Sequence, residues 1–211
     1  MKGYQAFLFD MDGTLVDSEP LKGLALALAC QDFGASVEAV IYQGVMGENW
    51  QTVTGHFFRH AGISPDLDEF NQHFRTYYEA LLTDRVSLNP GARDFIHALK
   101  AAGKQCAIVS SAATWMVEQI LDDLQLNGLF DLVITQEHVS QHKPDPEAYV
   151  LALSRLNLSP HQALIFEDSE AGVIAGVKSG CEVIAFSHAF NGKNDLSQAS
   201  RIISSYEDLR L

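Results

Sequence analysis

Basic side chains are scarce in this sequence. Its 211 residues include 14 lysines and arginines against 27 aspartates and glutamates, a formal net charge of −13, and protonation of all eight histidines would still leave the chain acidic. No run of lysines or arginines offers a local basic patch. These absences argue against a nucleic acid or an anionic membrane as the main partner, because both bind through clustered positive charge. A bound anion would need a local cation, either a side chain or a metal ion.

Cysteine and long apolar runs are also scarce. The three cysteines, Cys30, Cys106 and Cys181, show no CxxC spacing, which favours reduced, buried thiols. Asp10 and Asp12 interrupt the apolar N-terminal stretch that a signal peptide would need. The longest apolar runs, such as residues 24–30, are far too short to span a bilayer. We therefore expect a soluble cytoplasmic protein, and we take it to be a monomer.

Short apolar runs alternate with helix-period segments along most of the chain. Strands are predicted at residues 6–9, 106–109, 132–135, 164–166 and 183–186, with a weaker one at 202–203, and helices at 92–102, 114–124, 147–156 and 171–179. This alternation predicts an α/β fold, a three-layer, Rossmann-like parallel sheet covered by helices on both faces. We assign residues 1–16 and 86–211 to this core domain.

One interval between predicted strands is too long for a single crossover helix. Phe9 and Cys106 are 97 residues apart, whereas the later intervals are 17 to 29 residues. Residues 17–85 show no convincing strand, and helices are predicted there at 21–33, 37–43, 50–61 and 68–82. An aromatic stripe of Phe57, Phe58, Phe70 and Phe74 is expected in a core. The sequence therefore predicts an all-helical cap domain at 17–85, inserted after the first strand.

Polar side chains follow the predicted strands, where parallel sheets bind their ligands. The first strand is followed by Asp10 and Asp12, the second by Ser110 and Ser111, the third by a loop with Lys143, and the fourth by Glu167 and Asp168. Two such acids about 4 Å apart repel by roughly 4 kcal/mol at an effective dielectric constant of 20, so a cation is expected between them. An oxygen-only set selects a hard cation, and Mg²⁺ suits it best. A Ca²⁺-binding EF-hand loop is excluded, because Gly13 stands at loop position four instead of six.

Four segments, FLFDMDGTLVDSEP, IVSS, KPDP and FEDSEAG, in that order, resemble the four motifs of the haloacid dehalogenase superfamily. More narrowly, they are similar to its phosphatase and β-phosphoglucomutase-like branch, whose cap matches residues 17–85 in position and type. The resemblance implies an aspartyl-phosphate mechanism that depends on Mg²⁺. It also implies a metal held by the Asp10 and Asp168 carboxylates and the Asp12 backbone carbonyl, with Glu167 acting through a water.

The resemblance implies roles for the other strand-end residues. Asp10 would attack phosphorus, and Asp12 would protonate the leaving oxygen and later deprotonate the attacking water. We expect neighbouring negative charge to raise the pKa of Asp12. Lys143 would neutralise Asp10 and a phosphoryl oxygen. Donors to the phosphoryl group would be Ser110, Ser111 and the backbone N–H groups of Met11 and Asp12.

The inserted helices would exclude water and supply specificity. β-Phosphoglucomutases carry a His on the first cap helix and an Arg in the cap loop, and the matching residues here are Lys22 and Gly47. Without that Arg, a second phosphate loses its bidentate partner, which disfavours a mutase. Candidate substrate contacts are Lys22, Glu48, Asn49 and Trp50. We predict a phosphatase of small phosphorylated metabolites, with sugar phosphates as the preferred class.

Two alternatives stay open. One is a phosphosugar mutase of the β-phosphoglucomutase kind. The other is a phospho-acceptor signalling switch, because receiver domains also combine clustered acids, a hydroxyl and a lysine on a parallel sheet. A switch would place the accepting Asp on a middle strand and would need no helical lid, so Asp10 on the first strand favours an enzyme.

Two further patterns are interpreted as structural. The histidine pairs His56/His60 and His138/His142 have helical spacing but no apparent third ligand, so we expect polar helix faces and not metal sites. The glycines at 172, 176 and 180 lack the GxGxxG spacing of a nucleotide loop. Small residues at every fourth position instead predict a helix that sits close to the sheet.

Overall fold

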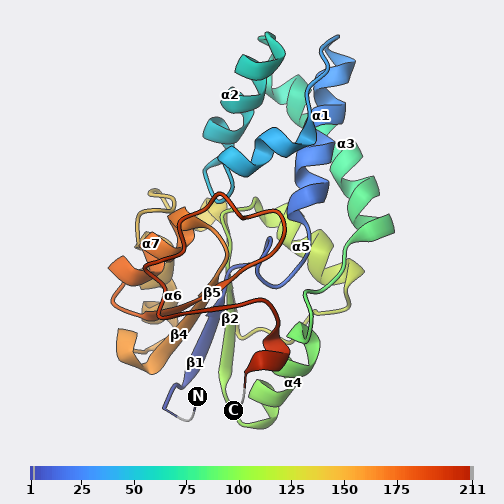
Figure 1. Cartoon of the computed structure of the whole chain (residues 1–211). Helices are drawn as coiled ribbons and strands as arrows, with labels where there is room; N and C mark the ends of the chain where they lie inside the picture. Colours follow the sequence, from blue (N-terminus) through green and yellow to red (C-terminus); the bar gives the residue numbers. More distant parts are fainter. Residues whose placement is uncertain (2, 210–211) are drawn as a thin grey trace.

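A six-stranded parallel sheet forms the centre of the computed structural model, which describes residue 1 and residues 3–209 (Figure 1). The strands are β1 (Ala6–Phe9), β2 (Gln105–Val109), β3 (Leu132–Ile134), β4 (Ala163–Glu167), β5 (Glu182–Phe186) and β6 (Arg201–Ile203). They lie in the order β3-β2-β1-β4-β5-β6, and every neighbouring pair is parallel. The predicted α/β class and strand positions are confirmed, and the weak sixth run is an edge strand.

Helices cover both faces of this sheet. They are α4 (Ala92–Ala101), α5 (Thr114–Asp123), α6 (Glu147–Leu156) and α7 (Glu170–Lys178). Successive residues of a strand point to opposite faces, so Phe7 and Phe9 pack in one apolar cluster with α4 and α5, whereas Leu8 packs in the other with α6 and α7. Three layers follow directly from strands that are apolar on both sides.

A helical insert separates β1 from α4. It consists of α1 (Glu19–Asp32), the 3₁₀ helix η1 (Ala39–Gly44), α2 (Trp50–Ala61) and α3 (Leu67–Arg85). Figure 1 shows these helices beyond the carboxyl ends of the strands. Three of the four predicted aromatics, Phe57, Phe70 and Phe74, are buried there, in a cluster continuous with one face of the sheet. The boundary of a separate cap domain at 17–85 stays a prediction.

Some predicted helix ends were wrong by a few residues. α1 begins at Glu19, two residues before the predicted start, because Pro20 fits the first turn of a helix, where no N–H is required. The segment predicted as a helix at 37–43 is a 3₁₀ helix, as short helical connectors often are. No helix of the described residues is both long and apolar enough to cross a membrane.

The three cysteines are buried and free, as predicted. Burial raises the pKa of the Cys106 thiol to about 12 and that of Cys30 to about 11. Thiols held in this protonated form are poor nucleophiles. The three cysteines therefore act as small apolar residues of the core.

Candidate active site

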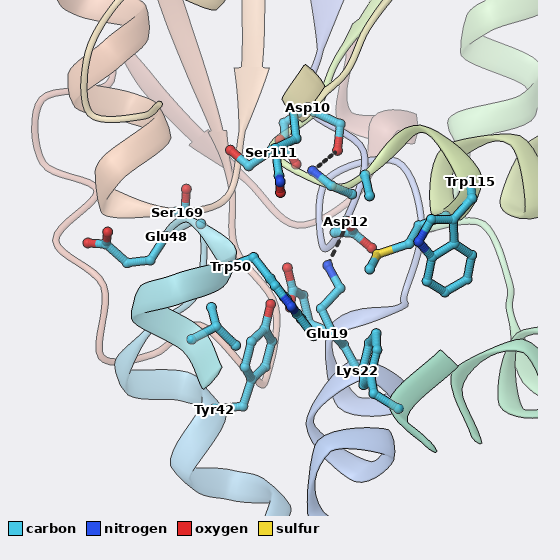
Figure 2. Close-up of a pocket in the computed structure, with 18 of the residues that line it drawn as sticks. Asp10, Asp12, Glu19, Lys22, Tyr42, Glu48, Trp50, Ser111, Trp115 and Ser169 are labelled. Atoms are coloured by element: carbon cyan, nitrogen blue, oxygen red, sulfur yellow. Dashed lines mark hydrogen bonds and ion pairs between the residues drawn. The ribbon is translucent and has the colours of Figure 1, made fainter. Parts of the chain in front are cut away.

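A cavity of about 450 Å³ lies between the carboxyl ends of the strands and the helical insert (Figure 2). On the sheet side it is lined by the predicted residues Asp10, Asp12, Ser110, Ser111 and Asp168. On the insert side it is lined by Lys22, Glu48 and Trp50. β1, β2 and β4 are neighbours in the sheet, so their ends bring residues more than 150 positions apart to one edge.

Lys143 lies buried beneath this edge. Its Nζ donates to Asp10 Oδ1 and Glu167 Oε1, each at 2.5 Å, and to the carbonyl oxygen of Val109 at 3.1 Å. Burial alone would lower the pKa of Lys143, but the two carboxylates raise it above its ordinary value. The lysine is therefore a fixed positive charge directly beside Asp10.

Glu167 holds that lysine in place. It is fully buried, and its Oε1 accepts from Lys143 and from the Tyr149 hydroxyl at 2.7 Å. Its Oε2 accepts from the backbone N–H of Asp168 at 3.1 Å. Both oxygens thus have protein donors, and this geometry makes Glu167 a positioning residue for Lys143. Its water-mediated contact with a metal stays a prediction.

Gly172 makes room for the Glu167 carboxylate. A Cβ at position 172 would lie 2.0 Å from the carboxylate atoms of Glu167, far inside contact distance. Gly176 likewise packs against Val183 of β5, where a Cβ would meet Cγ2 at 2.7 Å. The predicted close approach of helix to sheet is correct for these two glycines. Gly180 instead follows the helix, with φ of +85°.

Gly172→Ala is expected to lower the free energy of unfolding by about 1–3 kcal/mol, as overpacking does, and to disturb Lys143 through Glu167. Gly55→Ala in α2 is the matched control, because its Cβ would meet nothing closer than Arg59 Nη1 at 3.4 Å. A helix-interior Gly→Ala change without a clash stabilises by about 0.5–1 kcal/mol. Urea unfolding of both variants measures the difference. Equal stability of the two would contradict the tight packing at Gly172.

Asp10, Glu167 and Asp168 place carboxylate oxygens within 4.8 Å of one another, and all three residues are buried. Burial, opposed by Lys143 and reinforced by the neighbouring acids, raises the pKa of Asp10 well above its ordinary range. Burial and the charges of Glu19 and Glu167 do the same to Asp168. The single positive charge of Lys143 does not neutralise three carboxylates. This set of oxygen donors therefore fits a hard divalent cation. The acidic triad could therefore hold a metal ion.

Two contacts orient the Asp168 carboxylate. Thr14 donates its hydroxyl to Oδ1 at 3.2 Å, and His188 Nε2 lies 2.9 Å from Oδ2. Gly13 passes so close that a Cβ there would lie 2.1 Å from Oδ2. His188 was not among the predicted site residues, although it follows the end of β5, where parallel sheets bind their ligands.

A model of the haloacid dehalogenase-like hydrolase family matches residues 7–186. The chain belongs to this family. It is 33% identical over 181 residues to hexitol phosphatase A of Escherichia coli, covering 86% of this chain and 82% of that protein. It is 28% identical over 199 residues to a phosphorylated carbohydrates phosphatase of Thermotoga maritima, covering 94% and 92%. The crystal structure of CbbY from Rhodobacter sphaeroides in complex with phosphate shares 25% identity with a TM-score of 0.86, covering 96% and 94%.

This haloacid dehalogenase-like hydrolase is a phosphatase of the branch that includes β-phosphoglucomutases and phosphoglycolate phosphatases and carries a helical cap. The resemblance stated from the four motifs is confirmed. Apart from Ala6, the family match spans strands β1 to β5 together with the helical insert, and the edge strand β6 lies beyond it.

Asp12 of this phosphatase has a different electrostatic environment from the predicted one. Its carboxylate accepts from Lys22 Nζ at 2.7 Å, from the Ser18 hydroxyl at 2.5 Å and from the Tyr78 hydroxyl at 3.3 Å. Burial raises the pKa of Asp12, but Lys22 and the two hydroxyls outweigh burial and lower it. The predicted rise in the pKa of Asp12 was wrong. The insert places the cation of Lys22 directly against the Asp12 carboxylate, and this outweighs the neighbouring negative charges.

The insert residues predicted to contact substrate divide into two groups. Lys22, Glu48 and Trp50 line the cavity, although Lys22 is already paired with Asp12. Trp50 also donates its Nε1–H to Asn71 at 2.8 Å. Asn49 lies outside the cavity lining, and its side chain caps α2 by accepting from the Thr52 N–H at 3.0 Å.

The predicted phosphoryl donors lie on the sheet side. Ser110 is buried, and its Oγ accepts from the Ala112 N–H at 3.0 Å while lining the cavity. Ser111 is half-buried beside it. Met11 is buried in the core, so only its backbone is a candidate donor.

Three of the histidines in the two pairs make local contacts. His56 Nε2 contacts the carbonyl oxygen of Ile41 at 3.0 Å, and His60 Nδ1 contacts that of His56 at 2.9 Å. His138 Nδ1 contacts Thr135 at the start of a short 3₁₀ helix. Each of these rings therefore serves local backbone structure.

Proposed function

We propose that this phosphatase hydrolyses sugar phosphates with Mg²⁺ through an aspartyl phosphate on Asp10. One observation carries the proposal: Asp10 lines the cavity with a lysine 2.5 Å from one carboxylate oxygen. The second oxygen is left to face an incoming phosphoryl group. Relatives that act on hexitol phosphates and on phosphorylated carbohydrates, by their names, support the substrate class.

In the first step, Asp10 attacks phosphorus in line with the ester oxygen and becomes phosphorylated. Lys143 stabilises the charge on the phosphoryl oxygens, since it is held rigidly by Glu167. The side chains of Ser110 and Ser111, and the backbone N–H groups of Met11 and Asp12, donate to the same oxygens. The sugar leaves as an alcohol after its oxygen takes a proton from Asp12.

In the second step, a water attacks the phosphorus of the aspartyl phosphate while Asp12 accepts its proton. The bond between phosphorus and the Asp10 oxygen breaks, which restores the Asp10 carboxylate and releases inorganic phosphate. The lowered pKa of Asp12 suits this half of the cycle, because a carboxylate is the basic form. For the first half, Asp12 has to gain a proton although Lys22 favours the ionised form. The Lys22–Asp12 pair is therefore expected to tune the balance between the two steps.

The Asp10 and Asp168 carboxylates and the Asp12 backbone carbonyl would hold Mg²⁺, with Glu167 behind them through a water. When bound, the ion neutralises the carboxylates and the phosphoryl oxygens, which lowers the repulsion between an acidic site and an anionic substrate. The raised pKa values of Asp10 and Asp168 support this assignment, since both acids lack a sufficient cation.

Gly47 opposes the mutase alternative. It has φ of +76°, and a Cβ at this position would lie 2.5 Å from Ser169 Oγ. The position that carries an Arg in β-phosphoglucomutases thus has no room for a side chain, and no cation is offered there to a second phosphate.

The test is release of inorganic phosphate from p-nitrophenyl phosphate and from hexose 6-phosphates. We expect steady turnover with Mg²⁺, a loss on the order of 100-fold or more after EDTA treatment, and recovery when Mg²⁺ is restored. Turnover that EDTA leaves unchanged would contradict the metal assignment. Isomerisation of a hexose phosphate without phosphate release would indicate a mutase, and one retained phosphoryl group per chain without turnover would indicate a switch.

A further inference from the structure

Glu19, the first residue of α1, is a buried acid with no assigned role. Its exposed fraction is 3%, and its Oε2 has no hydrogen-bond partner within the part of the chain that the structure describes. The residue lines the cavity together with Lys22 and Tyr42 (Figure 2). A buried carboxylate oxygen without a donor destabilises a folded protein, so this arrangement points to a donor that arrives with a ligand.

The charges around Glu19 indicate that the ligand group that donates to it is neutral or cationic. Burial raises the pKa of Glu19 and outweighs the opposing charge of Lys22 and a contact with the Tyr42 hydroxyl, while the charge of Asp12 raises the pKa further. That lysine is already paired with Asp12 at 2.7 Å. An anionic group of a substrate placed beside Glu19 would therefore meet two acids and a cation that is already neutralised.

The rest of the insert wall offers no better partner for a second anion. Arg75 lines the cavity, but its Nε lies 2.6 Å from Glu79 and its guanidinium lies over the ring of Trp115 at 4.5 Å. Glu48 and Glu137 add further acids to the lining. The cavity wall is thus acidic and aromatic, which suits the hydroxyls and the C–H faces of a sugar or polyol.

We propose that Glu19 selects the leaving group by accepting a hydrogen bond from one of its hydroxyls. The substrate class is then phosphate monoesters of uncharged polyhydroxy alcohols, in preference to esters that carry a carboxylate or a second phosphate. This inference rests on the proposed phosphatase function and specifies the substrate of the same site. Sites built to bind a hydroxyl discriminate strongly against analogues that lack it, because the buried acceptor is then left unpaired.

The test compares Glu19→Ala and Glu19→Gln with wild type on four substrates. They are sorbitol 6-phosphate, phosphoglycolate, fructose 1,6-bisphosphate and p-nitrophenyl phosphate, which has no hydroxyl to offer. Wild type is expected to prefer sorbitol 6-phosphate. Glu19→Ala should lower kcat/KM for it by roughly 10- to 100-fold, the effect of one hydrogen bond to a charged group. The ratio of kcat/KM for sorbitol 6-phosphate to that for p-nitrophenyl phosphate should fall by a similar factor, because the effect of the lost Glu19 charge on Asp168 is common to both substrates. Glu19→Gln should lie between Glu19→Ala and wild type.

Glu38→Gln is the matched control, since Glu38 is an exposed acid of the insert whose side chain caps nothing. It should leave all four activities unchanged. Thermal unfolding without substrate adds a second readout. Removal of an unpartnered buried acid should leave the midpoint unchanged or raise it by about 2–4 °C, whereas loss of a structural residue would lower it.

The outcomes separate this inference from the proposed function. Absence of Mg²⁺-dependent hydrolysis of p-nitrophenyl phosphate by wild type would overturn both. If that hydrolysis is present, an equal loss on p-nitrophenyl phosphate and sorbitol 6-phosphate in Glu19→Ala would overturn the inference alone. A fall of the unfolding midpoint by more than about 4 °C would do the same, as would a wild-type preference for phosphoglycolate or the bisphosphate.

Discussion

Asp10→Asn is expected to abolish turnover, with kcat reduced on the order of 10⁴-fold or more. The amide has nearly the shape of the carboxylate but is not a nucleophile toward phosphorus, so no covalent intermediate can form. The fold should survive, because the Asn Oδ1 can still accept from Lys143 and one buried negative charge is removed. Steady-state kinetics with p-nitrophenyl phosphate and circular dichroism measure the two properties separately.

Trapping of the intermediate sharpens this experiment. Acid quenching of wild type during turnover of a ³²P-labelled substrate should leave a hydroxylamine-sensitive label, and Asp10→Asn should leave none. Asp17→Asn, an exposed acid on the same loop, is the control and should behave as wild type. Near-normal turnover in Asp10→Asn, or a label that persists in it, would remove Asp10 from the nucleophile role.

Lys143→Met is expected to remove activity and to lower the free energy of unfolding by about 3–5 kcal/mol, the usual effect of breaking a buried ion pair from one side. The methionine fills similar space but leaves Asp10 and Glu167 buried without their shared cation. The thermal midpoint should fall by roughly 6–20 °C for a chain of this size. Lys193→Met, which removes an exposed lysine, should change neither property.

The stability deficit of Lys143→Met should depend on pH. The pKa of Asp10 is already raised in the folded protein, and loss of the lysine raises it further. The folded variant then binds protons more readily than the unfolded chain, so its free energy of unfolding falls as pH rises. Urea unfolding should show a larger deficit at pH 8 than at pH 5. A deficit independent of pH would mean that lost packing, and not uncompensated charge, destabilises the variant.

The sheet side of the site could be predicted from the sequence because it follows from topology. Parallel strands end at one edge, so Asp10, Ser110 and Asp168 had to approach one another once their strands were recognised. The motif resemblance supplied the same residues with their chemistry. The strand runs were recognisable because they are apolar on both faces and bounded by turn residues.

The insert side could not be predicted in the same way. Tyr78 reaches Asp12 from α3, 66 residues along the chain, and no local pattern marks it. Lys22 was predicted to contact substrate, but the packing of α1 over the sheet edge brings it to Asp12. The direction of the Asp12 pKa shift followed from that packing. The sequence pattern shows which residues lie on a helix. Which groups those residues contact depends on how the helix packs against the rest of the protein.

The contacts of Asp12 have a consequence for chimeric enzymes. Two of its partners, Lys22 and Tyr78, belong to the helical insert, whereas Asp12 itself belongs to the loop after β1. Exchange of inserts between members of the family would thus replace two partners of the Asp12 carboxylate along with the substrate-facing wall. If Asp12 transfers the proton as proposed, a transplanted insert has to match its new host at positions 22 and 78 to keep that step intact.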